Sequence, residues 1–232
     1  MWTMVVESAK LFRADRWTVS YFTETKFAGK SAYRMRPLKE LADERRSTVD
    51  PRQYGSEPIV YVGLENVRST TGELVEFSPR PASSIKSRSK TFRVGDVLYG
   101  RLRPELNKVY LAHPPVSEGM CSGEFIVLSP RKDVVLSRYL RHILASSFVT
   151  QFASKFTVGA SLPRMSTRDL LDIEVPVPPL DVQAKLVEQL AQIDQEIIAL
   201  RSRLDTLPAQ QAKGLLAALS SGTPVIEIEV AT

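Results

Sequence analysis

The stretch IEVPVPPLDVQAKLVEQLAQIDQEIIAL, residues 173–200, joins two kinds of structure without a linker between them. Its first residues alternate between apolar positions and polar or proline positions, which is typical of a strand. Three prolines then interrupt the strand, and Asp181 follows them as a candidate helix cap. We therefore expect the last strand of a globular part to lead directly into a helix that begins near Asp181.

This helix carries a narrow apolar stripe. The gaps between its apolar positions are 4, 3, 4, 3, 4 and 3 residues, which is the period of a coiled-coil seam. The seam positions, which we assign to dimerisation, are Leu186, Leu190, Ile193, Ile197, Leu200, Leu204 and Leu207. A helix that packs on its own domain usually has a wider stripe, so the pattern favours a partner helix, with packing on the chain itself as the alternative. Pro208 predicts a break, followed by a shorter helix that ends near Gly222.

The residues before this helix predict a mainly antiparallel sheet with a few helices, which is an α+β fold. Apolar residues at helical spacing predict helices at 36–47, at 137–156 and, for one turn, at 167–172. Short runs rich in β-branched and aromatic residues predict strands at 59–67, 74–78, 92–102 (with a Gly-Asp turn inside), 108–113, 124–130 and 173–178. We divide the chain into a globular domain at 1–178, a helical region at 179–222 and a C-terminal tail at 223–232.

The composition is that of a globular protein. Of 232 residues, 43% are hydrophobic and 25% are charged, and no apolar run approaches the roughly 20 residues of a membrane span. The N-terminal sequence lacks the basic lead and the apolar length of a signal peptide, so we expect a cytoplasmic protein. Cys121 is the only cysteine, and His113 and His142 are the only histidines. This set is too small for a Cys/His zinc site, so we expect no metal and no cofactor.

Positive charge is concentrated in the globular part. The net charge is +5, from 31 basic and 26 acidic residues. Residues 181–232 hold four of the basic and seven of the acidic side chains, which leaves 27 basic and 19 acidic ones, a net of +8, in 1–180. A basic globular part followed by a mildly acidic helix indicates a polyanionic partner for the globular part.

Two segments are candidates for contact with DNA. Residues 80–108 contain eight basic side chains against two acidic ones, with serines between them, and 159–168 add two arginines among hydroxyl groups. Such residues contact phosphates, and arginine can also bind guanine edges, although a solvated charged loop is the alternative. From the first segment we select Lys86, Arg88, Lys90, Arg101, Arg103, Asn107 and Lys108. From the second we select Ser161, Arg164, Ser166 and Arg168, nearer to the bases.

No catalytic motif is evident, so we do not expect an enzyme. The sequence has neither a phosphate-binding P-loop nor a glycine-rich dinucleotide fingerprint. The Pro-Pro-Leu run that ends at Leu180 has no catalytic Asn or Asp before it, as base methylation would require. Glu73, Glu76 and Glu124 lack the spacing of a nuclease site, and we expect a surface role for them.

Five stretches together resemble a known family. In order they are YVGLENV, KTFRVGDVLYGRLRPELNKV, GMCSGEFIVL, VGASLPRMSTRDLLDIEVPVPPLDVQAKLVEQLAQID and LPAQQAKGLLAALSSG. They look like the target recognition domain and the following conserved helix of the DNA specificity (S) subunit of type I restriction–modification systems. The resemblance covers about residues 59–222.

The resemblance implies a fold and a function. A typical S subunit has two recognition domains, each of which binds half of a split site in the major groove of double-stranded DNA. Two conserved helices pair antiparallel between them, and methyltransferase (M) subunits dock there. This chain has one recognition domain and one helical region, so the resemblance implies a half-length form that completes itself as a homodimer. A restriction (R) subunit is a further candidate partner.

Two other interpretations stay open. The heptads could assemble a scaffolding protein of a defence complex that does not bind a specific DNA sequence. The chain could also be the recognition half of a single-chain restriction and methylation enzyme. The family's base-contacting residues vary with the target, so none is carried over here.

Overall fold

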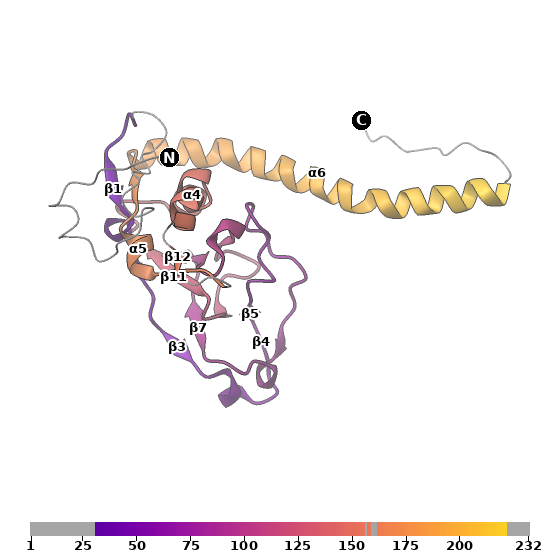
Figure 1. Cartoon of the computed structure of the whole chain (residues 1–232), viewed down its shortest axis with the longest axis horizontal. Helices are drawn as coiled ribbons and strands as arrows, with labels where there is room; N and C mark the ends of the chain where they lie inside the picture. Colours follow the sequence, from indigo (N-terminus) through magenta and orange to yellow (C-terminus); the bar gives the residue numbers. More distant parts are fainter. Residues whose placement is uncertain (1–30, 156, 159–161, 222–232) are drawn as a thin grey trace, which may run out of the picture. The chain divides into compact units, whose positions relative to one another are not determined.

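A computed structural model describes residues 31–155, 157–158 and 162–221 of the chain (Figure 1). The chain divides into two compact units, Met1–Ala184 and Lys185–Thr232. Ser161, one of the predicted DNA-contacting residues, lies outside the described residues. None of the described helices is long and apolar enough to cross a membrane.

Two four-stranded sheets organise the described part of the first unit. In one sheet all neighbours are antiparallel, and the order is β2 (Ala42–Glu44), β11 (Phe125–Pro130), β8 (Val97–Gly100) and β9 (Val109–Leu111). In the other the order is β3 (Thr48–Val49), β7 (Ser89–Phe92), β10 (Gly119–Cys121) and β5 (Tyr61–Val62), with β10 and β5 parallel. The class is α+β, as predicted.

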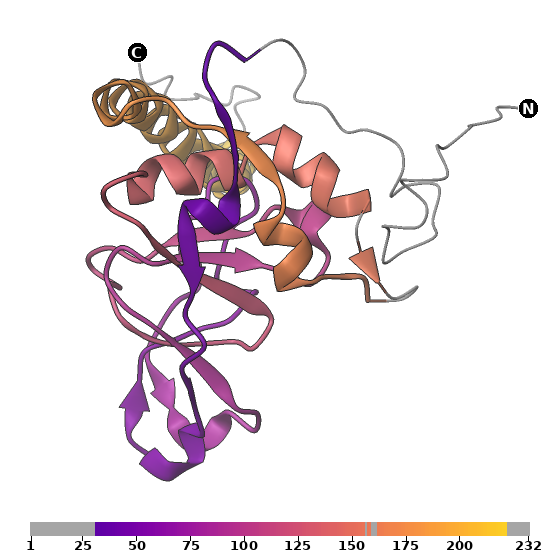
Figure 2. The ribbon, with the colours of Figure 1, turned by 90° about the vertical axis from the view of Figure 1, so that its left-hand side faces the viewer.

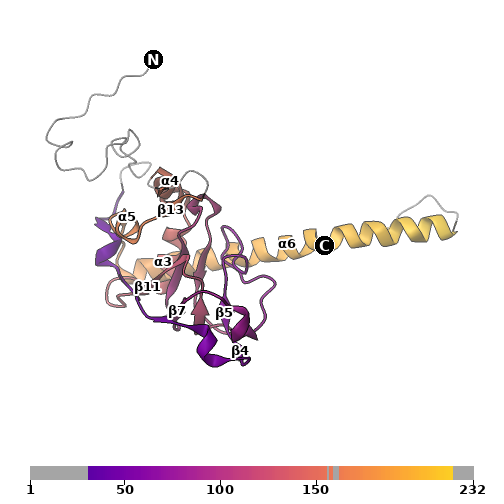
Figure 3. The same ribbon diagram turned by 60° about the horizontal axis from the view of Figure 1, so that its bottom comes forward.

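Short strand pairs and helices complete this unit. The pairs are β1 (Met35–Pro37) with β14 (Glu174–Pro176), β4 (Pro58–Ile59) with β6 (Arg80–Pro81), and β12 (Thr157–Val158) with β13 (Arg164–Met165). The helices are α3 (Ser137–Leu144), α4 (Ser147–Lys155) and α5 (Thr167–Leu171), with 3-10 turns η1 (Leu38–Glu40), η2 (Pro51–Tyr54), η3 (Ala82–Ser84) and η4 (Pro104–Leu106). Helix α3 packs on β8 and β9 (Figure 3). The β3 and β4 strands lie at the end of the unit that is remote from α4, as two views show (Figures 1 and 2).

A buried carboxylate holds the first sheet together. Asp96, in the predicted Gly-Asp turn before β8, has a side chain only 4% exposed. It accepts two hydrogen bonds from Arg45 (2.6 and 3.0 Å), one from the hydroxyl of Ser129 (2.7 Å) and one from the backbone N–H of Arg93 (2.8 Å). The hydrogen bonds with Asp96 raise the pKa of Arg45 above its ordinary value. Because a buried charge is tolerated only when it is paired, this network explains the acidic residue in the turn.

The predicted helix at 36–47 is wrong. This segment instead forms β1, the single turn η1 and β2. The backbone N–H of Leu38 donates to the carbonyl of Ile173 (2.9 Å), and the carbonyl of Leu41 accepts from Arg131 (2.8 Å). Leu38 and Leu41 are both fully buried. Their spacing of three fits one helical turn equally well, and the long-range pairing decides the outcome.

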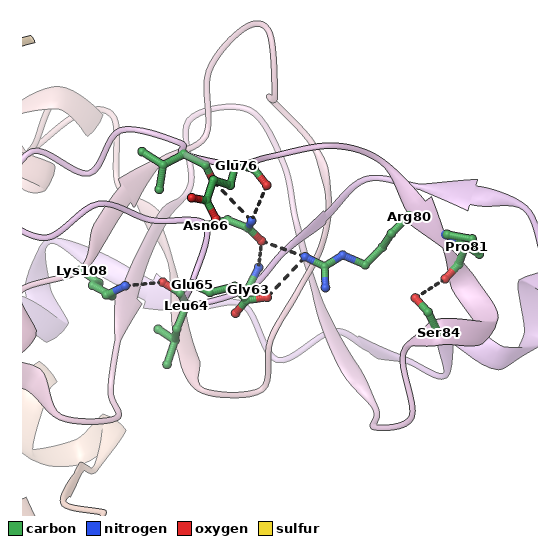
Figure 4. Close-up of polar contacts among 10 residues, drawn as sticks. Gly63, Leu64, Glu65, Asn66, Glu76, Arg80, Pro81, Ser84 and Lys108 are labelled. Carbon is green, nitrogen blue, oxygen red and sulfur yellow. Dashed lines mark hydrogen bonds and ion pairs between the residues drawn. The ribbon is translucent and has the colours of Figure 1, made fainter. Parts of the chain in front are cut away.

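Two predicted strands are shorter than expected or absent. The strand predicted at 59–67 ends at Val62, because Asn66 closes a turn on Gly63 (Figure 4). The side chain of Asn66 accepts from the Gly63 N–H (3.0 Å) and donates to the carbonyls of Val75 (3.4 Å) and Glu76 (3.2 Å). The segment predicted as a strand at 74–78 therefore contributes one isolated bridge, between Val67 and Leu74.

The other predicted helices are confirmed in kind but differ in their boundaries. The helix expected at 137–156 is divided into α3 and α4 around Ala145 and Ser146, where the Ser146 hydroxyl donates to the carbonyl of Ile143 (2.6 Å). The C-terminal helix α6 (Leu180–Ser221) runs without a break through Pro208, where we expected two helices (Figure 1). Proline removes one hydrogen bond of a helix and crowds the carbonyl four residues before it, but the helix continues on both sides of Pro208.

The first turn of α6 belongs to the first unit and is anchored by Gln183. Its side chain is fully buried. The side-chain oxygen accepts from the N–H of Leu136 (2.9 Å), and the side-chain nitrogen donates to the carbonyls of Val134 (3.0 Å) and Pro178 (2.8 Å). One amide thus satisfies three backbone groups and fixes where the helix begins.

Candidate nucleic-acid interface

The predicted basic residues around β7 lie beside β3. Lys86 and Arg88 are exposed just before β7, and one terminal nitrogen of Arg88 donates to the hydroxyl of Thr48 (3.1 Å). Lys90 is half-buried within β7, and its ammonium group lies 3.4 Å from a carboxylate oxygen of Glu44. Lys86 and Arg88 therefore keep their charge at the surface, while the charge of Lys90 is partly compensated.

A strained loop follows β8. Arg103 and Asn107 flank η4, and both have left-handed backbone conformations, with φ of 49° and 48°. Such values are uncommon for residues other than glycine and cluster at functional sites. The side chain of Arg103 is half-exposed, and its Nε lies 3.1 Å from Glu105.

The structure brings the two predicted segments together at this loop. The backbone N–H of Arg103 donates to the carbonyl of Pro163 (2.8 Å), and the N–H of Met165 donates to the carbonyl of Arg101 (2.9 Å). Arg101 and Arg103 therefore lie beside Arg164, although about 60 residues separate them in the sequence. The backbones of the two basic segments are thus joined at this loop, where Leu102 lies opposite Arg164.

Arg164 is held by a carboxylate that the sequence analysis placed on the surface without a role. Its Nε lies 3.0 Å from both oxygens of Glu124, and one terminal nitrogen lies 2.7 Å from Oε1. These hydrogen bonds raise the pKa of Arg164 above its ordinary value. The side chains are 39% and 29% exposed, so the pair is reachable from solvent.

The other described residues selected from the second segment are Ser166, which precedes α5, and Arg168, which lies in it. The hydroxyl of Ser166 accepts from the N–H of Asp169 (3.1 Å) and donates to its carboxylate (2.6 Å), which makes Ser166 the helix cap. Arg168 is exposed two residues further on. The hydroxyl of Thr167 donates to Glu44 (3.1 Å), the carboxylate that also contacts Lys90. Glu44 therefore connects the two basic segments at a second point.

Two predicted residues make hydrogen bonds within the unit. The side-chain nitrogen of Asn107 donates to the carbonyl of Ala145 (2.7 Å), and the ammonium group of Lys108 donates to the carbonyl of Leu64 (2.6 Å; Figure 4). These bonds support the fold of the η4 loop. Their contact with DNA stays a prediction.

Arg80 belongs to the basic segment 80–108 but is not among the candidates for DNA contact, and it joins a local cluster of side chains. One terminal nitrogen donates to the side-chain oxygen of Asn66 (3.1 Å) and lies 3.3 Å from Glu65 (Figure 4). Its guanidinium carbon lies 5.1 Å from the centre of the Tyr61 ring. No local sequence pattern indicates these contacts, because Tyr61 and Arg80 are brought together by separate strands.

The thiol of Cys121 and the potential metal ligands lie as follows in the described part of the chain. Cys121 is fully buried in β10, and burial raises its pKa to about 12. A neutral, inaccessible thiol is a poor nucleophile. No three His, Cys, Asp or Glu side chains in the described ranges lie close enough to hold a metal ion.

Residues 88–207 match the type I restriction modification DNA specificity domain, which is just over half of the 232 residues. The chain belongs to the type I restriction–modification specificity family. The match includes most of the selected DNA-contacting residues and the whole predicted seam.

Individual members of the specificity family agree with this membership. The EcoDI specificity subunit of Escherichia coli is 25% identical over 154 residues, which are 66% of this chain and 33% of the relative. The HindI specificity subunit of Haemophilus influenzae is 22% identical over 110 residues, which are 47% of this chain and 24% of the relative. The matched part of the chain therefore spans about a third of the length of the EcoDI subunit and about a quarter of the length of the HindI subunit.

Solved structures of the specificity family share the fold. The HsdS subunit from Thermoanaerobacter tengcongensis has a TM-score of 0.64 and 26% identity, over 90% of this chain and 54% of that one. A second solved chain comes from a structural study of complex assembly and conformational transition in the type I R-M system. It has a TM-score of 0.66 and 26% identity, over 89% of this chain and 53% of that one. The S subunit from M. genitalium, at 13% identity and a TM-score of 0.53, supports the fold alone.

The helical unit carries the predicted seam on an uninterrupted helix. Ile193, Leu200 and Leu204 are 51%, 58% and 62% exposed, and the other seam residues are half-buried. Beyond Pro208, Leu215 and Leu219 are also exposed, at 52% and 72%. A continuous helix with this much apolar surface is typical of one that pairs with another helix.

Proposed function

We propose that this chain is a specificity subunit that binds a defined DNA sequence through its first unit. The observation that supports this most strongly is the meeting of the two basic segments at the η4 loop, within the part of the chain that matches the specificity domain. Lys86, Arg88, Arg101 and Arg103 contact phosphates, and 162–168 lies nearer the bases. Phosphate contacts position the protein, and base contacts select the sequence.

We further propose that two copies pair through α6. The helices align their Leu and Ile seams antiparallel, and the pair sets the distance between two recognition units. Two identical units related by a twofold axis bind an interrupted palindrome: a half-site, an unread spacer and the inverted half-site. Methyltransferase subunits dock on the paired helices and supply the chemistry, while this chain itself catalyses nothing.

Selection of bound sequences from random duplex DNA tests this proposal. The full chain, alone and with its methyltransferase, should enrich an interrupted palindrome. Removing seven residues within 186–204 shortens the helix by about 10 Å and keeps the seam in phase. This deletion should shorten the spacer and leave the half-site unchanged. An asymmetric motif would refute the homodimer, and no enriched motif would favour the scaffolding function.

A further inference from the structure

The donor groups of Arg164 are only partly used within the protein. An arginine side chain has five N–H groups. Glu124 accepts from Nε and from one terminal nitrogen, and the carbonyl of Leu162 accepts from the other (3.1 Å). Each of the two terminal nitrogens therefore keeps one N–H that has no acceptor among the described residues.

Both partners of this pair are fixed by the backbone. The carbonyl of Glu124 accepts from the N–H of Arg101 (2.9 Å), and its own N–H donates to the hydroxyl of Ser122 (3.2 Å). Arg164 lies in β13 and forms a bridge with Leu102. The two-point contact with Glu124 then orients the plane of the guanidinium, which lowers the entropy cost of a further contact.

The geometry points to a guanine as the ligand of Arg164: we propose that Arg164, oriented by Glu124, donates its two remaining N–H groups to O6 and N7 of a guanine in the half-site. Bidentate donation from arginine to these atoms is the commonest specific contact in the major groove. The inference rests on the proposed function and adds one base of the target and its positioning residue, Glu124.

The charge of the pair favours a base over a phosphate. Glu124 compensates the charge of Arg164, so the pair attracts a phosphate weakly, and the carboxylate repels one. The nearby Arg101 and Arg103 supply the phosphate contacts instead. A compensated arginine with directed donors contributes sequence discrimination and little salt-dependent affinity.

The test uses the full chain and the duplex that the wild-type chain selects from random DNA. Each guanine of the half-site is replaced in turn by 7-deazaguanine, which lacks N7, or by adenine in the corresponding base pair. At one position, adenine should weaken wild-type binding by about 5- to 150-fold, the range for a single bidentate base contact, and 7-deazaguanine, which removes one of the two hydrogen bonds, should weaken it less. Arg164→Ala should lose most of that discrimination while its affinity keeps the wild-type dependence on salt.

Two conservative variants separate positioning from folding. Arg164→Lys keeps the charge but loses the planar fork, and because lysine can also donate to guanine, it should lose less of the discrimination than Arg164→Ala does. Glu124→Gln removes the compensating charge, so it should bind unrelated DNA more tightly and discriminate less. Arg131 pairs with Asp43 through the same atoms, at 3.1 and 2.7 Å, and Arg131→Ala is the matched control that should change neither property.

The outcomes distinguish this inference from the proposed function. If wild type selects a motif and Arg164→Ala discriminates at every guanine as wild type does, the guanine contact is refuted and the proposed function stands. If Arg164→Ala instead flattens the dependence on salt at unchanged discrimination, Arg164 contacts a phosphate. If wild type selects no motif, both are refuted.

Discussion

Replacing Gln183 by Met should destabilise the first unit strongly. Methionine has nearly the same volume as glutamine but cannot form the three hydrogen bonds to Leu136, Val134 and Pro178. Each buried backbone group left without a partner costs about 1–3 kcal/mol, and partial relaxation reduces the sum, so we expect a loss of about 3–5 kcal/mol. For a unit of this size, that corresponds to a decrease in Tm of about 10 °C.

Thermal unfolding followed by circular dichroism measures this loss. Gln195→Met is the matched control, because Gln195 is exposed on the same helix, and its Tm should stay within 1–2 °C of wild type, or about 0.5 kcal/mol. A Tm of Gln183→Met equal to that of the control would show that the buried amide does not hold the start of α6.

Three further outcomes are expected. Ile193→Asp with Ile197→Asp should convert a dimer to monomers in sedimentation equilibrium. If the wild-type chain is monomeric at micromolar concentration, with and without its methyltransferase, pairing through the seam is refuted. Lys86→Ala with Arg88→Ala should leave Tm unchanged. The slope of the logarithm of DNA affinity against the logarithm of salt concentration should become shallower by up to about 1.8, at about 0.9 per phosphate contact. An unchanged slope would place the DNA away from these two residues. Cys121 should resist alkylation in the folded chain. Because burial raises its pKa from 9.0 to about 12, the thiol ionises in the unfolded chain before it ionises in the folded one, so the stability of the folded chain should decline as pH rises above about 9. Alkylation as fast as in the unfolded chain would contradict the burial.

The parts that the sequence predicted well depend on local patterns. The helix after Pro179 follows from its spacing and its cap region, and the strand–turn–strand around Asp96 follows from a turn between two apolar runs. Both need only neighbours within a few residues. The break at Pro208 was also a local inference, but one missing hydrogen bond did not end a helix of 42 residues.

The parts that the sequence did not predict depend on distant partners. Glu124 could not be assigned a role, because its partner Arg164 is 40 residues away. Lys108 was chosen by its charge, yet its ammonium group meets a carbonyl 44 residues earlier. The helix predicted at 36–47 failed for the same reason, since its residues pair with strands more than 80 residues away.

The pairing of β1 with β14 makes the two ends of the recognition unit neighbours. Arg36 lies opposite Val175, and the carbonyl of Arg34 accepts from the N–H of Val177 (3.0 Å), so the segment between β1 and β14 begins and ends at neighbouring strands. Domains whose ends lie close together tolerate insertion into other chains and circular permutation. A different recognition unit, grafted between the same two strands, should bring a new half-site without changing the helix that follows.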